Sequence, residues 1–479
     1  MKLIYHTLST LVVAILLIAP QAQAEQYLLI NATLIDPATE TVTPNAWVHI
    51  ADGKILATGN TPLPAVAEHI DLDGAFLLPG LIDAHLHLTA GPLTVDMKDG
   101  APALSMVSHE AITRFHAAAA LASGVTTAFS PAGDPIANHR YAKQQRSGEL
   151  SGPALHYAGL FFDPTPIAGG SVYPGDADGW RAEIERQKAL GVSHIKLYHG
   201  LSEAELRQGT TLAKAAGLKS IAHLDHVSWQ FAADAGVDAL THAFMPSADL
   251  LPQAARAQFE ADRTPGSSQY LYRWFEAVDY DAEPMQTLFR TLASKNIRVD
   301  LTLIATEMAF IQPKLDSFYP TSDWQIHPAA ANWRQNIGMS VYNWTADDFQ
   351  RAEAVYPKVL ELVERMHEAG VPLLIGSDSY GAGDWFWREL QLHQRAGLDN
   401  WRILQMVTSD AARILQLGNI GRLKAGAQAD LIAITQNPLD DIAALRSVNL
   451  VIQAGIRHSV AALRADLASA AQAHRISAQ

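Results

Sequence analysis

The sequence predicts an α/β protein: a (β/α)8 TIM barrel with a small β-sandwich domain formed from both ends of the chain. Short apolar segments alternate with helical segments through residues 79–421, which is the pattern of parallel strands joined by crossover helices. Eight such segments match the number that a closed barrel of this type needs. The eight strand candidates are 81–88, 125–130, 154–162, 194–199, 220–224, 239–244, 297–304 and 372–379.

Both ends of the chain carry strand-like runs of a different kind, with alternating apolar residues broken by Gly, Asn and Pro. In the N-terminal run the Asp52-Gly53 pair lies between two apolar segments and predicts a hairpin. Because the strands at each end are too few to form a stable sheet alone, we expect 25–78 and 422–460 to form one small β-domain. Residues 461–479 follow as a C-terminal helix and tail.

Residues 1–24 have the organisation of a secretory signal. Lys2 precedes an apolar stretch that ends at Pro20, and the small residues Ala22 and Ala24 come just before Glu25. The alternative, an uncleaved membrane anchor, is disfavoured because the stretch is shorter than the ~20 apolar residues that span a bilayer. We therefore expect cleavage after Ala24, no stable membrane anchor after it, and an exported, periplasmic or secreted, protein.

Composition narrows the classes of partner. The 479 residues are 48% hydrophobic and 18% charged, as in a soluble globular protein, and the formal net charge is -14. Nucleic acid is therefore not expected as a partner, because it calls for a basic face. There is no cysteine, so export brings no disulfides.

Three segments are longer than barrel connections need and follow predicted strands. They are 163–179, which is rich in Gly and Pro, 245–290, and the aromatic-rich 308–356. Connections at this end of a barrel lie over the mouth, so the two longer ones could form a lid or a substrate wall. The alternative is a packing or dimer surface made of the same aromatics.

Residues able to bind a metal recur at the ends of the predicted strands, where barrels place their function. His85 and His87 are two residues apart, so they share one face of a strand. Each candidate alone has an ordinary explanation: a hydrogen-bonded core histidine, a helix cap at Asp378, or a buried ion pair at Lys196. The occurrence of all six candidates at strand ends of one predicted barrel indicates a metal site more specifically than any one of them does. The six candidates are His85, His87, Lys196, His223, His242 and Asp378.

Several motifs, in order along nearly the whole mature chain, resemble the metal-dependent amidohydrolases, in particular their imidazolonepropionase-like and prolidase-like branch. The more specific ones are the opening PGLIDAHLHL and the closing GRLKAG with ADL. The matching stretches are 79–88, 124–127, 191–198, 222–242, 370–379, 388–390, 396–398, TSDAARIL, IGRLKAGAQADL and NPL.

The resemblance implies two divalent metal ions, usually zinc, although cobalt and manganese suit the same ligands. His85, His87 and Asp378 would hold one metal, and His223 with His242 would hold the other. Lys196, carbamylated by carbon dioxide, would bridge them. A metal-bridging hydroxide would attack the carbonyl carbon, with Asp378 as general base.

The chain departs from the family pattern at two places. AFSPAGDP follows GVTT, which leaves the role of Asp134 open, and Phe386-Trp387 replaces the usual Leu-His while Glu389 is kept. Tyr198 shares a strand face with Lys196 and is expected either to contact substrate or to pack in the barrel mouth.

We therefore expect a hydrolase acting on the amide bond of a small molecule, most plausibly a dipeptide or an N-acyl amino acid, in a possible homo-oligomer. The alternative substrates are a cyclic amide, a lactone or a xenobiotic amide. A mononuclear deaminase is less expected because it has no use for Lys196. A barrel that has lost catalysis and serves only in binding is disfavoured because all six site residues remain.

Overall fold

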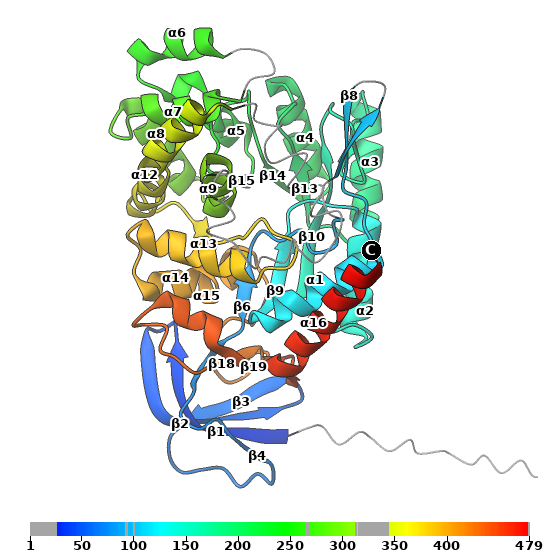
Figure 1. Cartoon of the computed structure of the whole chain (residues 1–479), viewed down its shortest axis with the longest axis vertical. Helices are drawn as coiled ribbons and strands as arrows, with labels where there is room; N and C mark the ends of the chain where they lie inside the picture. The colour runs from blue at the N-terminus through cyan, green and yellow to red at the C-terminus, as the bar shows by residue number, and fades with distance from the viewer. Residues whose placement is uncertain are drawn as a thin grey trace, which may run out of the picture.

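A computed structural model of the protein describes residues 26–91, 94–98, 101–263, 268–311, 314 and 344–477. The predicted signal segment 1–24 lies outside the described residues. Within them, a barrel of parallel strands sits above a smaller sheet, with the C-terminal helix along one side (Figure 1). No described helix is long and apolar enough to cross a membrane.

The eight predicted barrel strands are all present and pair in parallel in the order β17-β16-β15-β14-β13-β10-β9-β6. Backbone hydrogen bonds from Ala84 to Ile375 (3.0 Å) and from His87 to Ser379 (2.8 Å) close the ring beyond the ends of β6 and β17. The strands are β6 (Leu81–Asp83), β9 (Val125–Ser130), β10 (Ala154–Phe162), β13 (His194–Leu197), β14 (Lys219–Ala222), β15 (Ala239–Thr241), β16 (Arg298–Asp300) and β17 (Leu373–Leu374).

Six of the eight strands end earlier than the sequence predicted, and only β9 and β10 keep their predicted ends, so His223, His242 and Asp378 also follow their strands. β6 ends at Asp83, so His85 and His87 follow the strand rather than lie on it, although Leu86 still bridges to Ser379. The predicted strand 297–304 ends at Asp300, because helix α9 (Leu303–Ile311) begins inside it. The carboxylate of Glu389 accepts hydrogen bonds from the backbone N–H groups of Leu303 and Ile304 and so caps that helix.

Each barrel strand is followed by a crossover helix, with further helices after β15 and β16, and each crossover helix buries apolar side chains in the main core (Figure 1). Two of them start with a capping box, Ser202 with Glu205 and Thr345 with Asp348, which satisfies the free N–H groups of the first turn. The crossover helices are α1 (Glu110–Ala122), α2 (Pro135–Arg146), α3 (Ala177–Ala189), α4 (Glu203–Ala215), α5 (Trp229–Ala235), α8 (Glu283–Ser294), α12 (Ala346–Glu368) and α13 (Asp384–Arg395).

The N-terminal end of the barrel is closed by apolar residues of the chain after α13. Helices α14 (Asn400–Met406) and α15 (Ser409–Ile414) lie there, and Ala411 and Leu415 join a buried cluster with Ile82 and Phe129. The barrel is therefore plugged at this end, and its opposite end is left for the polar residues.

Strands from both ends of the chain share one small sheet, as predicted. Its order is β20-β19-β18-β5-β1-β2-β3, with β4 beside β1. The sheet curves round a core of its own, since the N–H of Ile55 in β3 reaches the carbonyl of Ala427, just before β18. The strands are β1 (Gln26–Asp36), β2 (Thr41–Ala51), β3 (Lys54–Gly59), β4 (His69–Asp71), β5 (Phe76–Pro79), β18 (Leu431–Ile434), β19 (Val448–Gln453) and β20 (Ile456–Ser459).

The predicted hairpin at Asp52-Gly53 joins β2 to β3. Both residues have positive φ, 53° and 71°, which matches the tight turn that Asp-Gly favours between twisted strands. The C-terminal helix α16 (Val460–Ser477) packs beside α1, where Leu463 and Leu467 meet the core (Figure 1).

The long connections are largely helical where the structure describes them. Residues 245–290 contain η1 (Ala248–Leu250), α6 (Gln253–Asp262) and α7 (Tyr270–Ala277) before α8. Phe310 and Trp344 are buried, with ring centroids 6.0 Å apart. The other predicted aromatics, Phe318 to Tyr342, lie outside the described residues, so the choice between lid and interface stays a prediction.

A small sheet at the C-terminal ends of the barrel strands combines the connections after β6 and β10. It contains β7 (Thr94–Lys98), β8 (Ala101–Ser105) and β11 (Ile167–Ala168), while β12 (Ser171–Val172) pairs with β10. Part of the predicted loop 163–179 is thus short strand.

Gly376 should be essential to barrel closure. A Cβ at this position would lie 2.3 Å from the Cβ of His85 and 2.7 Å from its backbone nitrogen. We expect Gly376→Ala to lower stability by about 1–3 kcal/mol, the usual cost of overpacking, seen as a lower thermal midpoint. Gly381→Ala is the control, because its Cβ would meet only ordinary contacts at 3.4 Å or more. Equal midpoints for the two variants would contradict the close approach.

Candidate metal centre

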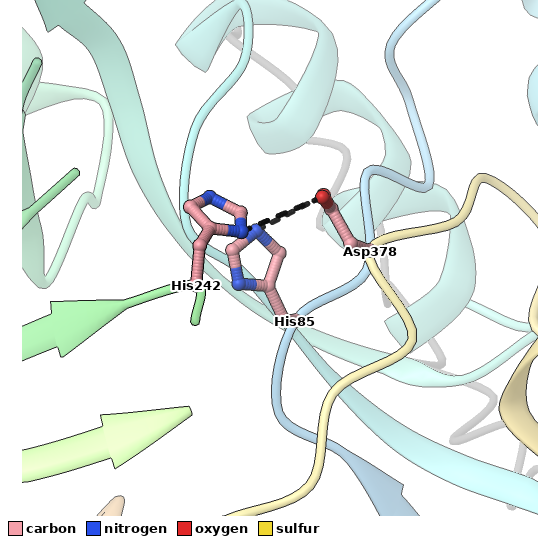
Figure 2. Close-up of side chains that lie close together, drawn as sticks. All are labelled: His85, His242 and Asp378. Atoms are coloured by element: carbon pink, nitrogen blue, oxygen red, sulfur yellow. Dashed lines mark ion pairs between the residues drawn. The ribbon is translucent and has the colours of Figure 1, made fainter. Parts of the chain in front are cut away.

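Three buried or half-buried side chains from three different strand ends converge at the C-terminal end of the barrel. They are His85 after β6, His242 after β15 and Asp378 after β17 (Figure 2). One ligand atom from each lies within 4.8 Å of the others. Such a group of two imidazoles and a carboxylate can hold a metal ion.

His85 is held from both sides of its ring. Its Nδ1 lies 2.6 Å from Oδ1 of Asp300, and its Nε2 lies 3.2 Å from Oδ1 of Asp378. Burial disfavours the protonated ring, but the two carboxylates outweigh it and raise the pKa of His85 to about 9. Two carboxylates thus converge on one buried ring, and a positive charge is favoured between them.

His87 points at the same carboxylate as His85. Its Nε2 lies 3.1 Å from Oδ1 of Asp378, and its Nδ1 lies 3.2 Å from the carbonyl oxygen of Ala132. A carbonyl can only accept, so Nδ1 donates to it while Nε2 faces the carboxylate of Asp378. His85 and His87, which were predicted to share one face of a strand, therefore both contact Asp378, although both lie beyond the end of β6.

His242 and His223 form the other side of the cluster. Their ring centroids are 4.1 Å apart, and Nδ1 of His242 lies 2.7 Å from Oγ1 of Thr302. Burial, together with neighbouring positive groups, holds the pKa of His223 well below its usual range. Burial likewise lowers the pKa of His242, although Asp378 opposes this. Both rings are therefore neutral, which is the form that binds metal.

Lys196 is buried in β13, beside this cluster. Its Nζ donates to Oγ1 of Thr241 at 3.0 Å, and within the described residues it forms no ion pair with a carboxylate. Burial lowers the pKa of Lys196 to about 8, against the attraction of Asp300 and Asp378.

Asp378 is the hub of the cluster. It has a left-handed backbone with φ 49°, and its Oδ2 lies 3.6 Å from Nδ1 of His242. Burial opposes its ionisation, but the positive charge favoured on His85, together with hydrogen bonds from His85 and His87, holds the pKa of its carboxyl well below the usual range. An ionised carboxylate among three histidines is a hard oxygen ligand beside nitrogen ligands.

Two supporting carboxylates were missed by the sequence prediction. Asp300, the last residue of β16, orients His85, and buried Asp83, the last residue of β6, accepts from the backbone N–H and Oγ of Ser377 at 3.0 and 2.6 Å. The sequence pattern that could have identified them is an aspartate at the end of an apolar strand, as in LIDAH and RVDLT. Metal-ligating histidines usually have such partners.

The other residues singled out in the sequence, Tyr198, Asp134 and Glu389, lie in different parts of the structure. Tyr198 lies edge-on to His223, with centroids 4.8 Å apart, and also contacts Phe161. Asp134 is not at the centre: it caps α2 by accepting from the N–H of Ile136. Glu389 caps α9, as described above.

The donor set fits a divalent metal of the zinc type. The imidazoles of His223 and His242 are neutral and Asp378 is ionised, so these three ligands need no further deprotonation. The raised pKa of His85 shows the same preference for a cation at this place.

Comparison with known proteins agrees with this geometry. Residues 302–457 match the family model described as the amidohydrolase family. An adenine deaminase of Paracoccus denitrificans is 37% identical over 81 residues, 16% of this chain and 13% of that protein. An imidazolonepropionase of Caldanaerobacter subterraneus subsp. tengcongensis is 49% identical over 45 residues, 9% of this chain and 11% of that protein. The chain thus matches only about a tenth of the length of these curated relatives.

Solved structures share the fold over most of the chain. A Xaa-Pro dipeptidase with bound methionine is 20% identical, covers 91% of this chain and 100% of its own, and has a TM-score of 0.65. A bottromycin amidohydrolase is 19% identical, covers 94% of this chain and 91% of its own, and has a TM-score of 0.68. The chain therefore matches the amidohydrolase family in sequence over residues 302–457 and shares the fold of these structures over more than nine tenths of its length.

Proposed function

We propose that the protein is a binuclear metal-dependent hydrolase that cleaves the amide bond of a dipeptide or an N-acyl amino acid. The observation that carries the proposal is the convergence of His85, His242 and Asp378, with His87 in contact with the same carboxylate. Polar residues at the C-terminal ends of barrel strands are the usual position of an active site in this fold.

His85, His87 and Asp378 would hold one cation, and His223 with His242 would hold the other. Between them we place Lys196 as a carbamate: its amine forms a C–N bond to carbon dioxide and loses a proton, which leaves an anionic bridging group. Its burial without a carboxylate partner among the described residues supports this assignment. When bound, the cations would polarise the substrate carbonyl and acidify water.

The side chains then have defined tasks. Asp378 accepts a proton from the attacking water and delivers it to the leaving nitrogen as the C–N bond breaks, while the hydroxyl stays on the acyl carbon. Asp300 and Thr302 hold the rings of His85 and His242 so that these do not rotate. Tyr198, beside His223, is placed to contact the substrate.

The substrate class rests on proteins of the same fold. A Xaa-Pro dipeptidase and a prolidase with an N-methylphosphonate-L-proline ligand share the fold over 91% of this chain. A bottromycin amidohydrolase shares the fold as well, and a cyclic amide, a lactone or a xenobiotic amide stays the alternative substrate. Export, proposed from residues 1–24, suits hydrolysis of scavenged peptides.

A substrate panel tests the function. Zinc-loaded protein should hydrolyse Xaa-Pro dipeptides or N-acyl amino acids faster than cyclic amides and lactones, measured as kcat/KM from released amine. Asp378→Asn should lower turnover at least about a hundredfold, the scale of losing a general base. Asp399→Asn is the control, because Asp399 only caps the distant helix α14. Near-normal turnover of Asp378→Asn would contradict the proposed role.

Metal content tests the second ion and its bridge. Protein stripped with a chelator should lose activity and regain it with zinc and bicarbonate, with two equivalents bound. Lys196→Ala should bind no more than one equivalent tightly, because the bridging anion is lost, as measured by elemental analysis after gel filtration. Two tight equivalents in Lys196→Ala would rule out the bridge, and no stoichiometric metal in the wild type would rule out the whole proposal.

Asp300→Asn tests the orientation of His85. The amide removes the negative charge beside Nδ1 and can donate to that atom, which favours the wrong tautomer. We expect metal affinity about 10–100-fold weaker, measured by competition with a chromogenic chelator. Asp399→Asn again serves as control, and unchanged affinity in Asp300→Asn would show that this carboxylate does not position the ligand.

A further inference from the structure

A second cavity lies at the N-terminal end of the barrel, opposite the metal centre. It measures about 360 Å³ and is bounded by the first residues of β14 and β16 and by the end of α15. Four of its eleven lining residues are charged. They are Lys219, Asp238, Lys295 and Arg298.

Arg298 is buried there without a partner for its charge. The residue is 5% exposed, and its Nη2 has no hydrogen-bond partner in the described part of the chain. Its guanidinium packs over the ring of Phe129 at 4.9 Å, and Asp238 and Asp300 act on it only at longer range. Burial lowers the pKa of Arg298 to about 10, so it stays charged at neutral pH.

An isolated buried cation is costly. The penalty for removing an ion from water is several kcal/mol unless an opposite charge compensates it. Lysine can lose its proton when buried, but arginine near neutral pH cannot. A guanidinium lining a cavity therefore calls for an anion in that cavity.

The other charged groups leave an excess of positive charge. Lys219, at the start of β14, lines the same cavity, whereas Lys295 already pairs with Asp234 at 2.6 Å. Asp238 is the lining carboxylate, but its Oδ2 accepts from the N–H of Ser220 at 2.8 Å and from its Oγ at 3.3 Å. Lys219 and Arg298 are thus the two cations that an incoming anion would meet.

We propose that this cavity binds a small organic oxyanion through its phosphate or carboxylate group. The planar guanidinium of Arg298 can bind two oxygen atoms at once, and the ammonium group of Lys219 would supply a second contact. The volume exceeds that of a bare ion and falls in the range of small-molecule pockets. The site is independent of the proposed hydrolysis, because it lies at the plugged end of the barrel.

Titration of the zinc-loaded protein with inorganic phosphate and, separately, acetate tests the site. At constant ionic strength kept with chloride, one of the two should bind saturably by calorimetry and raise the thermal midpoint. Lys219→Met and Arg298→Met should weaken that binding about tenfold or more, since each removes a charged hydrogen bond. The matched control is Lys143→Met on the exposed face of α2, which should bind as the wild type does. The stronger of the two probes identifies the ligand group.

Because phosphate also binds metals, the position must be seen directly. Crystals grown with selenate should give an anomalous peak beside Arg298. A peak at the metal centre alone, no saturable binding of either probe, or wild-type affinity in Lys219→Met would overturn the proposal. If Arg298→Met does not fold, Lys219→Met and the anomalous map decide.

Discussion

The rest of the structure depends on the closure of the barrel between the segment after β6 and the segment after β17. Ala84 and His87 donate backbone hydrogen bonds across this junction, and Gly376 leaves no side chain in the way. The same junction brings His85 and His87 to Asp378. Barrel closure therefore also brings the ligands from the two ends of the barrel sequence together.

Strand β16 and the turn after it orient two histidines of the candidate metal centre. Asp300 and Thr302 each contact a histidine ring, and the backbone just beyond them is held by Glu389. These groups are buried, so each hydrogen bond is made in a medium of low dielectric, where an unmade one would be costly. The proposed chemistry thus relies on residues that never touch the substrate.

The two ends of the barrel interior differ in charge and in closure. At the C-terminal end, Asp300 and Asp378 contact the histidines of the candidate cation site. At the N-terminal end, Arg298 and Lys219 line the proposed anion site. Apolar residues of α15 plug the second end, so the two sites do not share a ligand. Parallel strands permit this separation, because all of their beginnings meet at one rim and all of their ends at the other.

The sequence by itself determined the barrel, the small sheet from both chain ends, and the strand-end positions of His85, His87, Lys196, His223, His242 and Asp378, because apolar periodicity and short spacings are local properties of a chain. It misjudged where six of the eight barrel strands end. Only the tertiary structure decided that Asp300 orients His85 and that Arg298 is buried without an ion pair to any carboxylate of the described residues. The physical reason is distance along the chain: His85 and Asp300 are 215 residues apart and meet through barrel closure, which no local pattern records.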